Sequence, residues 1–254
     1  MRSHARILHR GAHGRGSRLR VVALMTIMAL LLMGMVATET AWTRAWPDQT
    51  FKKDGGPGGG PPPGQPVLGR TEEVKPVRGK IFVILNGTLV PLSSKVGLTT
   101  GTTIDALHGT LQLTTATGKG LATQTGTFGG AVFKVTQARS GPSKGLTTLT
   151  LVNNAFQGAP SFASCTAATS AGASAAAVSS KVLQLLHAKD SHGKFRTKGR
   201  YAAATTRGTV WSIADRCDGT LTHVNQGTVV VNDLVRHKNV TVHAGGSYLA
   251  KAAK

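Results

Sequence analysis

The chain has 254 residues, of which 40% are hydrophobic but only 5% aromatic, and 32 are glycines. So few aromatic rings exclude a core built mainly from them. Thr, Val, Gly and Ala must carry the structure, and that composition is typical of β-strands joined by tight turns. The length suffices for one substantial domain together with a targeting segment and a linker.

The chain is strongly basic. Its formal net charge is +20, and without the six arginines that precede Val21 it is still about +14. A charge of this size attracts polyanions over long range. The candidates are nucleic acid, anionic lipid headgroups and the phosphate- or carboxylate-rich polymers of a cell wall. The alternative is surface lysine that only keeps the protein soluble.

The first 37 residues have the organisation of a targeting or anchoring segment. Residues 1–20 are basic, and residues 21–37 (VVALMTIMALLLMGMVA) are apolar apart from Thr26. As a helix, residues 21–37 would span roughly 25 Å, within the lower range for a membrane span. A basic stretch before an apolar core is also the pattern of a secretory signal.

We therefore predict a basic cytoplasmic tail over 1–20 and a transmembrane anchor or signal core over 21–37. Cleavage after Ala37 or Ala41 would place Met35 or Glu39 at the −3 position, which favours the uncleaved anchor. Either way the residues that follow are exported, because positive charge stays on the cytoplasmic side. The predicted location is a single-pass membrane protein with its C-terminal domain outside, or a secreted protein after cleavage.

Residues 38–73 form the predicted linker. Within it, residues 55–69 read GGPGGGPPPGQPVLG, in which glycine gives flexibility and the proline run gives local extension. The folded domain is predicted over 74–254.

The domain begins with a β pattern. Residues 81–85 and 88–92 are expected to pair across Asn86-Gly87, since both turn residues tolerate positive φ. Further short strands are expected at the following positions: 103–105, 110–114, 131–137 and 146–152. Many short strands with Gly-rich turns predict an all-β domain of β-sandwich or β-roll type.

One packing α-helix is expected between two β regions, within an insertion over 168–190. Residues 173–188 are Ala-rich, and Val178, Val182, Leu185 and Leu186 follow the i, i+4, i+7, i+8 spacing of an apolar helix stripe.

The stretch 206–250 is the clearest train of strands and turns. We expect a strand around Val210, a hairpin turn at Asp218-Gly219, and an alternating strand over 220–224. Two more strands follow, over 228–231 and 239–243.

This last stretch resembles the FecR-like family of bacterial extracytoplasmic domains. The matching residues are Arg207-Gly208-Thr209, Trp211, Ile213, Asp218-Gly219-Thr220, Val224-x-x-Gly227-x-Val229-x-Val231 and Val240-x-Val242-x-Ala244-Gly245. A looser similarity covers Gly79-x-Ile81, Gly101 to Asp105 and Leu111-x-Leu113. The resemblance implies an exported β domain.

The same family includes membrane regulators that couple envelope signals to sigma factors. About 20 residues precede the apolar segment here, too few for a sigma-binding domain. A regulatory role would therefore act through a membrane signalling partner.

The two cysteines, Cys165 and Cys217, lie in the exported part. An even count in an oxidising compartment favours a disulfide. A cysteine-nucleophile enzyme, with His192 or His223 as base, is the alternative.

A basic cluster is expected to bind polyanions. It consists of Lys189, Lys194, Arg196, Lys198 and Arg200, with Phe195 and Tyr201 interleaved. Nucleic acid could use such a cluster, but export makes an anionic envelope polymer or the membrane surface the expected partner.

Motifs for other chemistry are lacking. The sequence has no phosphate-binding loop, nucleophile elbow or zinc-type Cys/His spacing. His223 and His243 are the one pair that neighbouring strands could bring together. We therefore expect a non-enzymatic binding or sensing module without metal or cofactor.

Overall fold

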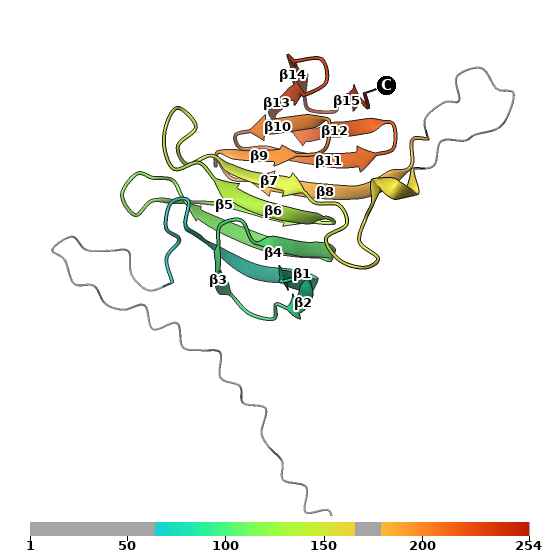
Figure 1. Ribbon diagram of the computed structural model, residues 1–254. Coiled ribbons are helices and arrows are strands. Elements are labelled where there is room, and N and C mark those ends of the chain that lie inside the picture. Colours follow the sequence, from blue (N-terminus) through green and yellow to red (C-terminus); the bar gives the residue numbers. More distant parts are fainter. Residues whose placement is uncertain (1–63, 166–178, 254) are drawn as a thin grey trace, which may run out of the picture. The chain divides into compact units, whose positions relative to one another are not determined.

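The computed structural model describes residues 64–165 and 179–253, and this part of the chain is all-β, with no α-helix (Figure 1). Fifteen strands form one sheet. Their bounds are β1 Thr71–Leu85, β2 Thr88–Pro91, β3 Val96–Thr99, β4 Thr103–Ala116, β5 Thr123–Gly129, β6 Val132–Gln137, β7 Thr147–Leu151, β8 Val182–Asp190, β9 Phe195–Lys198, β10 Ala202–Thr206, β11 Val210–Arg216, β12 Gly219–Gln226, β13 Thr228–Asp233, β14 Lys238–His243 and β15 Ser247–Lys251. One 3-10 turn, η1, covers Phe162–Ser164.

The sheet divides in two at strand β4, which we call the trunk. One of its edges pairs along most of its length with β1, which also carries β2 and β3. On the other edge, residues 103–105 pair with β6 and residues 110–116 pair with β5. The change of partner occurs at Ala106, whose amide donates to the Ala131 oxygen at 3.0 Å and whose oxygen accepts from the Gly130 amide at 2.8 Å.

Two series of paired strands, which we call branches, continue from β4. One runs β5-β8-β11-β12-β15 and the other runs β6-β7-β9-β10-β13-β14. All strand pairs are antiparallel except β7 with β9. We call the first the β5 branch and the second the β6 branch.

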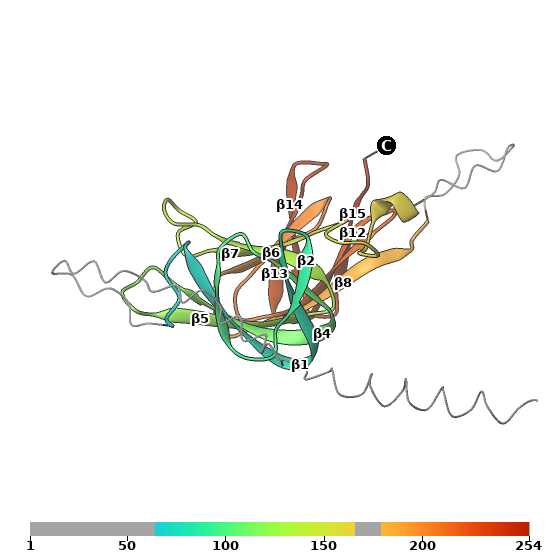
Figure 2. The ribbon, with the colours of Figure 1, turned by 60° about the horizontal axis from the view of Figure 1, so that its bottom comes forward.

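The branches meet at their far ends, so the sheet is nearly closed and barrel-like (Figure 2). The single residue Gly227 separates β12 from β13, although these strands belong to different branches. Gly227 has φ 83°, which lets the chain turn sharply there. The Val224 amide also donates to the Gly246 oxygen at 3.0 Å and ties β12 to the β14–β15 connection.

The core lies between the two branches and contains four aromatic rings, those of Phe128, Phe133, Phe195 and Trp211. Phe128 is 5.4 Å from Phe195 and 6.4 Å from Trp211 between ring centroids, and all three side chains are buried. Offset and edge-to-face contacts of this kind are favourable beyond the area they bury. The Trp211 Nε1 donates to Thr197 Oγ1 at 2.9 Å, which satisfies the only polar atom of the indole.

The predicted hairpins are present, with one change of register. Asn86 and Gly87 have φ of 51° and 78° and join β1 to β2 as expected. In the second hairpin Arg216 faces Gly219, so the turn residues are Cys217 and Asp218. The expected Asp218-Gly219 turn was therefore wrong by one residue.

The predicted packing helix is wrong. Residues 182–190 of the expected insertion form β8, which pairs with β5 and β11, and the rest of the expected helix over 173–178 lies outside the described residues. Alternate side chains of β8 point inward from Gln184 to Asp190. Both of these polar residues are bonded: Gln184 Oε1 accepts from the Val132 amide at 3.0 Å, and Asp190 accepts from Thr206. Polar residues on the buried face hid the strand alternation from the sequence.

The strand β1 begins at Thr71 with Glu72 and Val74 buried, so the domain starts slightly before residue 74. The expected tail, the anchor or signal segment and most of the linker lie outside the described residues. Among residues 64–165 and 179–253, no helix is long and apolar enough to cross a membrane.

Candidate functional site

The structure separates the five predicted polyanion-binding residues into different surroundings. Lys189 is on β8 of the β5 branch, whereas Arg196 and Lys198 are on β9 of the β6 branch. Lys194 is exposed just before β9, and Arg200 follows it. These five residues, although close in the sequence, therefore do not form one continuous surface.

Arg200 is engaged by aromatic rings beside the disulfide. Its guanidinium lies 4.4 Å from the centroid of the Phe162 ring and 5.5 Å from that of Tyr201. Its amide donates to Asp215 Oδ1 at 2.9 Å. These contacts attach the η1 segment to the sheet, so Arg200 stabilises structure there.

Arg196 and Lys198 line a groove on the outer face of the β6 branch. The groove has a volume of about 700 Å³. Its lining residues come from six strands and the loop after β13: Thr136, Thr148, Thr150, Arg196, Lys198, Ala203, Thr205, Val230, Asn232, Leu234 and Asn239. We call this the Arg196–Lys198 groove.

The buried side of β9 fixes which way its cations point. Phe195 and Thr197 are fully buried, and Thr197 accepts the indole bond of Trp211. Because side chains alternate along a strand, Arg196 and Lys198 must point outward. A shift of one residue would bury both charges, which is strongly unfavourable.

The register places hydroxyl groups beside each cation. Arg196 lies opposite Thr148 on β7 and Thr205 on β10, and its Nε donates to Thr205 Oγ1 at 3.1 Å. Lys198 lies opposite Thr150 and the small Ala203. The Thr205 bond orients the guanidinium across the groove.

The groove contains cations and neutral hydrogen-bonding groups but no carboxylate among its lining residues. Asn232 Nδ2 donates to Asn239 Oδ1 at 2.8 Å, so these two amides form its far wall as a bonded pair. Arg and Lys pair with phosphate, sulfate or carboxylate groups, while Thr and Asn can bond sugar or polyol hydroxyls. The lining therefore suits an anionic ligand rich in hydroxyl groups.

Sequence reasoning found the two cations but missed the threonines and asparagines around them. The one local signal was alternation: Thr148 and Thr150 flank buried Leu149, and Val230 and Asn232 flank buried Val231. The sequence cannot show that β7 and β13 lie on either side of the β9–β10 pair.

The two cysteines form the predicted disulfide. Cys165 and Cys217 are bonded with their Cα atoms 5.4 Å apart, which joins η1 to the β11–β12 turn. Since the chain has two cysteines, neither is left as a thiol nucleophile. A cysteine nucleophile would require the disulfide to be reduced first.

Each histidine of the pair considered from the sequence bonds a different hydroxyl group. His223 bonds Ser247 Oγ on β15 at 2.8 Å, whereas His243 bonds Thr228 Oγ1 on β13 at 3.2 Å. Within the described ranges, no group of three or more His, Cys, Asp or Glu side chains could hold a metal ion.

Three buried carboxylates have shifted pKa values. Burial raises the pKa of Glu72 to about 8, and its Oε1 has no hydrogen-bond partner among the residues that the structure describes. Burial also raises the pKa of Asp215, against the lowering effect of bonds from the Arg200 amide and Thr220. Neither carboxyl lines the groove.

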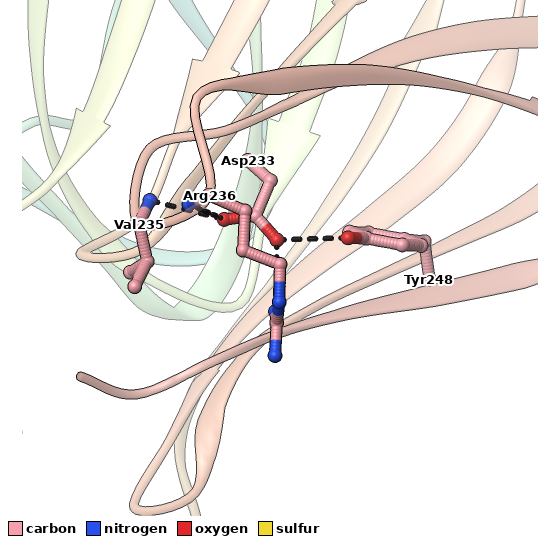
Figure 3. A network of polar contacts seen from close by, with 4 residues as sticks. All are labelled: Asp233, Val235, Arg236 and Tyr248. Carbon is pink, nitrogen blue, oxygen red and sulfur yellow. Dashed lines mark hydrogen bonds and ion pairs between the residues drawn. The ribbon is translucent and has the colours of Figure 1, made fainter. Parts of the chain in front are cut away.

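Asp233 behaves oppositely because it is fully bonded (Figure 3). Burial by itself would raise the pKa of Asp233, but hydrogen bonds from Arg236, Tyr248 and Val235 together lower it. Its Oδ2 accepts from Arg236 Nη1 at 3.1 Å and from the Tyr248 hydroxyl at 2.8 Å. The same carboxylate lowers the acidity of Tyr248: burial and the bond to Asp233 raise the pKa of that phenol.

In comparisons with protein families, curated proteins and solved structures, no family model, protein or structure matches this chain. The FecR-like resemblance therefore stays a prediction.

Proposed function

We propose that this chain is a non-enzymatic, exported module of the cell envelope that binds an anionic, hydroxyl-bearing polymer in the Arg196–Lys198 groove. The observation that carries the proposal is the lining itself. Two cations project among threonine hydroxyls and asparagine amides, and no carboxylate is present among these residues to compete for them.

Two further features support export. The basic, then apolar, start of the sequence has the pattern of an anchor or signal. The Cys165–Cys217 disulfide belongs to an oxidising compartment. A FecR-like sensing role is compatible with both features, and the ligand polymer would then be the signal or the attachment point.

Binding of the full-length protein to poly(glycerol phosphate), with neutral dextran as a comparison, tests the proposal. We expect Arg196→Gln with Lys198→Gln to weaken binding to the charged polymer about tenfold or more, since each lost charge-assisted bond contributes roughly 1.5–3 kcal/mol. Rising salt should weaken wild-type binding.

The matched control removes two charges elsewhere, at exposed Lys119 and Lys251. It should leave binding within about twofold of wild type, since distant surface charges are largely screened at physiological salt. An equal loss in the control, or wild-type binding that high salt does not change, would overturn the groove as the site.

A further inference from the structure

A second hollow lies on the outer face of the trunk and the β5 branch, away from the Arg196–Lys198 groove. It has a volume of about 470 Å³ and shares no lining residue with the groove. Its charged and hydrogen-bonding walls come from β1, β4, β5, β8 and β12: Arg78, His108, Thr110, Thr127, His187, Lys189 and Asn225. We call it the Gly129 hollow.

Glycine makes the floor of this hollow. In the register of the sheet, Gly129 stands between Thr110 on β4 and His187 on β8; it is itself buried and lies on the same face of β5 as the half-buried Thr127. A Cβ at Gly129 would collide with the Gly109 carbonyl oxygen. A side chain at this position would require the backbone to shift, so the floor of the hollow is bare backbone.

Cationic and imidazole side chains stand around the glycine. Arg78 and His187 are three strands apart in one cross-strand row, roughly 14 Å between Cα atoms at about 4.8 Å per strand. Lys189 lies next to Thr127 in the neighbouring row. Each of the three side chains is exposed, so each can reach a ligand without leaving a buried position.

No carboxylate lines the hollow. The nearest acidic side chain on β1, Glu73, is already paired with Lys95 at 2.7 Å. The positive charges of Arg78 and Lys189 are therefore not neutralised by the residues that share the hollow with them. Arg and Lys favour phosphate and sulfate oxygens, and imidazole, hydroxyl and amide groups can bond the carrier of that anion.

We infer that the Gly129 hollow is a second binding site, for a phosphate or sulfate group carried on a sugar or polyol. Arg78 and Lys189 neutralise the oxyanion, and His108, His187 and Asn225 bond the hydroxyl-bearing part. The inference rests on this hollow alone and stands whether or not the Arg196–Lys198 groove binds a polymer. If both sites act, one molecule contacts two segments of an anionic polymer on separate branches of its sheet.

Isothermal titration of the full-length protein tests the site with three small probes: glycerol 3-phosphate, inorganic phosphate and uncharged glycerol. We expect glycerol 3-phosphate to bind more tightly than inorganic phosphate, and glycerol not to bind measurably. Arg78→Gln with Lys189→Gln should weaken glycerol 3-phosphate binding about tenfold or more, since two charge-assisted interactions are lost.

The control variant Lys75→Gln with Lys80→Gln removes two charges from the same strand face outside the lining. It should bind glycerol 3-phosphate as the wild type does, and so should the Arg196→Gln/Lys198→Gln variant. The inference is overturned if the Lys75/Lys80 control loses as much affinity as the Arg78/Lys189 variant, because diffuse charge then explains binding. It is also overturned if binding disappears only in the Arg196/Lys198 variant, or if no phosphate probe binds.

Discussion

The Tyr248 hydroxyl donates to Asp233 Oδ2 at 2.8 Å and thereby bonds β15 of one branch to the end of β13 in the other. This contact lies where the two branches of the sheet meet, and Figure 3 shows the Tyr248 hydroxyl pointing at the Asp233 carboxylate. The closing of the sheet therefore involves a specific, partly buried polar bond as well as apolar packing.

Tyr248→Phe should lower the free energy of unfolding by about 1–3 kcal/mol, because the buried Asp233 carboxylate loses one of its donors. Urea unfolding at neutral pH measures the loss. Tyr201→Phe is the matched control, since the Tyr201 hydroxyl has no hydrogen bond among the described residues, and a change within about 0.5 kcal/mol is expected there. Equal effects of the two substitutions would show that the Asp233 bond adds no stability.

The buried Glu72 should make the protein less stable as the pH rises. Its pKa is about 8 in the folded protein against 4.5 ordinarily, so between these values the folded state holds a proton that the unfolded state has released. The contribution of Glu72 to the free energy of unfolding is then fully present below pH 4.5. It falls by up to about 1.4 kcal/mol per pH unit towards pH 8.

Glu72→Gln should remove this slope and stabilise the protein at pH 8 while changing little at pH 4. The midpoints of urea unfolding, measured for the wild type and the variant between pH 4 and pH 8, test this prediction. Glu73→Gln, which removes only the ion pair with Lys95, should keep the slope of the wild type. A wild-type stability that rises from pH 5 to pH 8 would contradict the prediction.

Reduction of the Cys165–Cys217 disulfide should destabilise the domain by about 3–4 kcal/mol, because the bond closes a loop of 52 residues. In protein taken from membrane and medium fractions, alkylation should label both cysteines only after reduction. Free thiols before reduction would count against export. A Cys165→Ser/Cys217→Ser variant should unfold at the same urea concentration with or without reductant.

Filling the Arg196–Lys198 groove should block polymer binding without any change of charge. Thr150 is half-exposed on the groove wall, where Thr150→Tyr places a ring beside Lys198 and keeps a residue that favours strands. We expect weaker binding of poly(glycerol phosphate) with stability within about 0.5 kcal/mol of wild type. Thr125→Tyr, on the outer face of β5, should bind normally. If both variants bind equally well, the groove is not the contact surface.

The sequence was most informative where structure is local. Asn86-Gly87 predicts its hairpin because the turn needs two residues that accept positive φ. The disulfide followed from cysteine count and compartment. The β8 strand was mistaken for a helix because Val182 and Leu186, four residues apart, fit both periods, and because Gln184 and Asp190 use their buried positions for hydrogen bonds.

The candidate sites depend on contacts that no local pattern contains. Thr148 lies opposite Arg196 only because β7 and β9 pair in parallel, and Arg78 shares a cross-strand row with His187 only through β4 and β5. β9 and β10 are also short, and β10 begins with three alanines, which have low β propensity. The burial of Phe195 and Thr197 on β9, and of Ala202 and Ala204 on β10, fixes the place of these two strands in the sheet.

The division of the sheet at β4 also relates the two candidate sites to each other. The Arg196–Lys198 groove belongs to the β6 branch, and the Gly129 hollow spans the trunk and the β5 branch. Because β5 and β6 pair with successive residues on one edge of β4, this single strand connects the two candidate sites through continuous backbone hydrogen bonding.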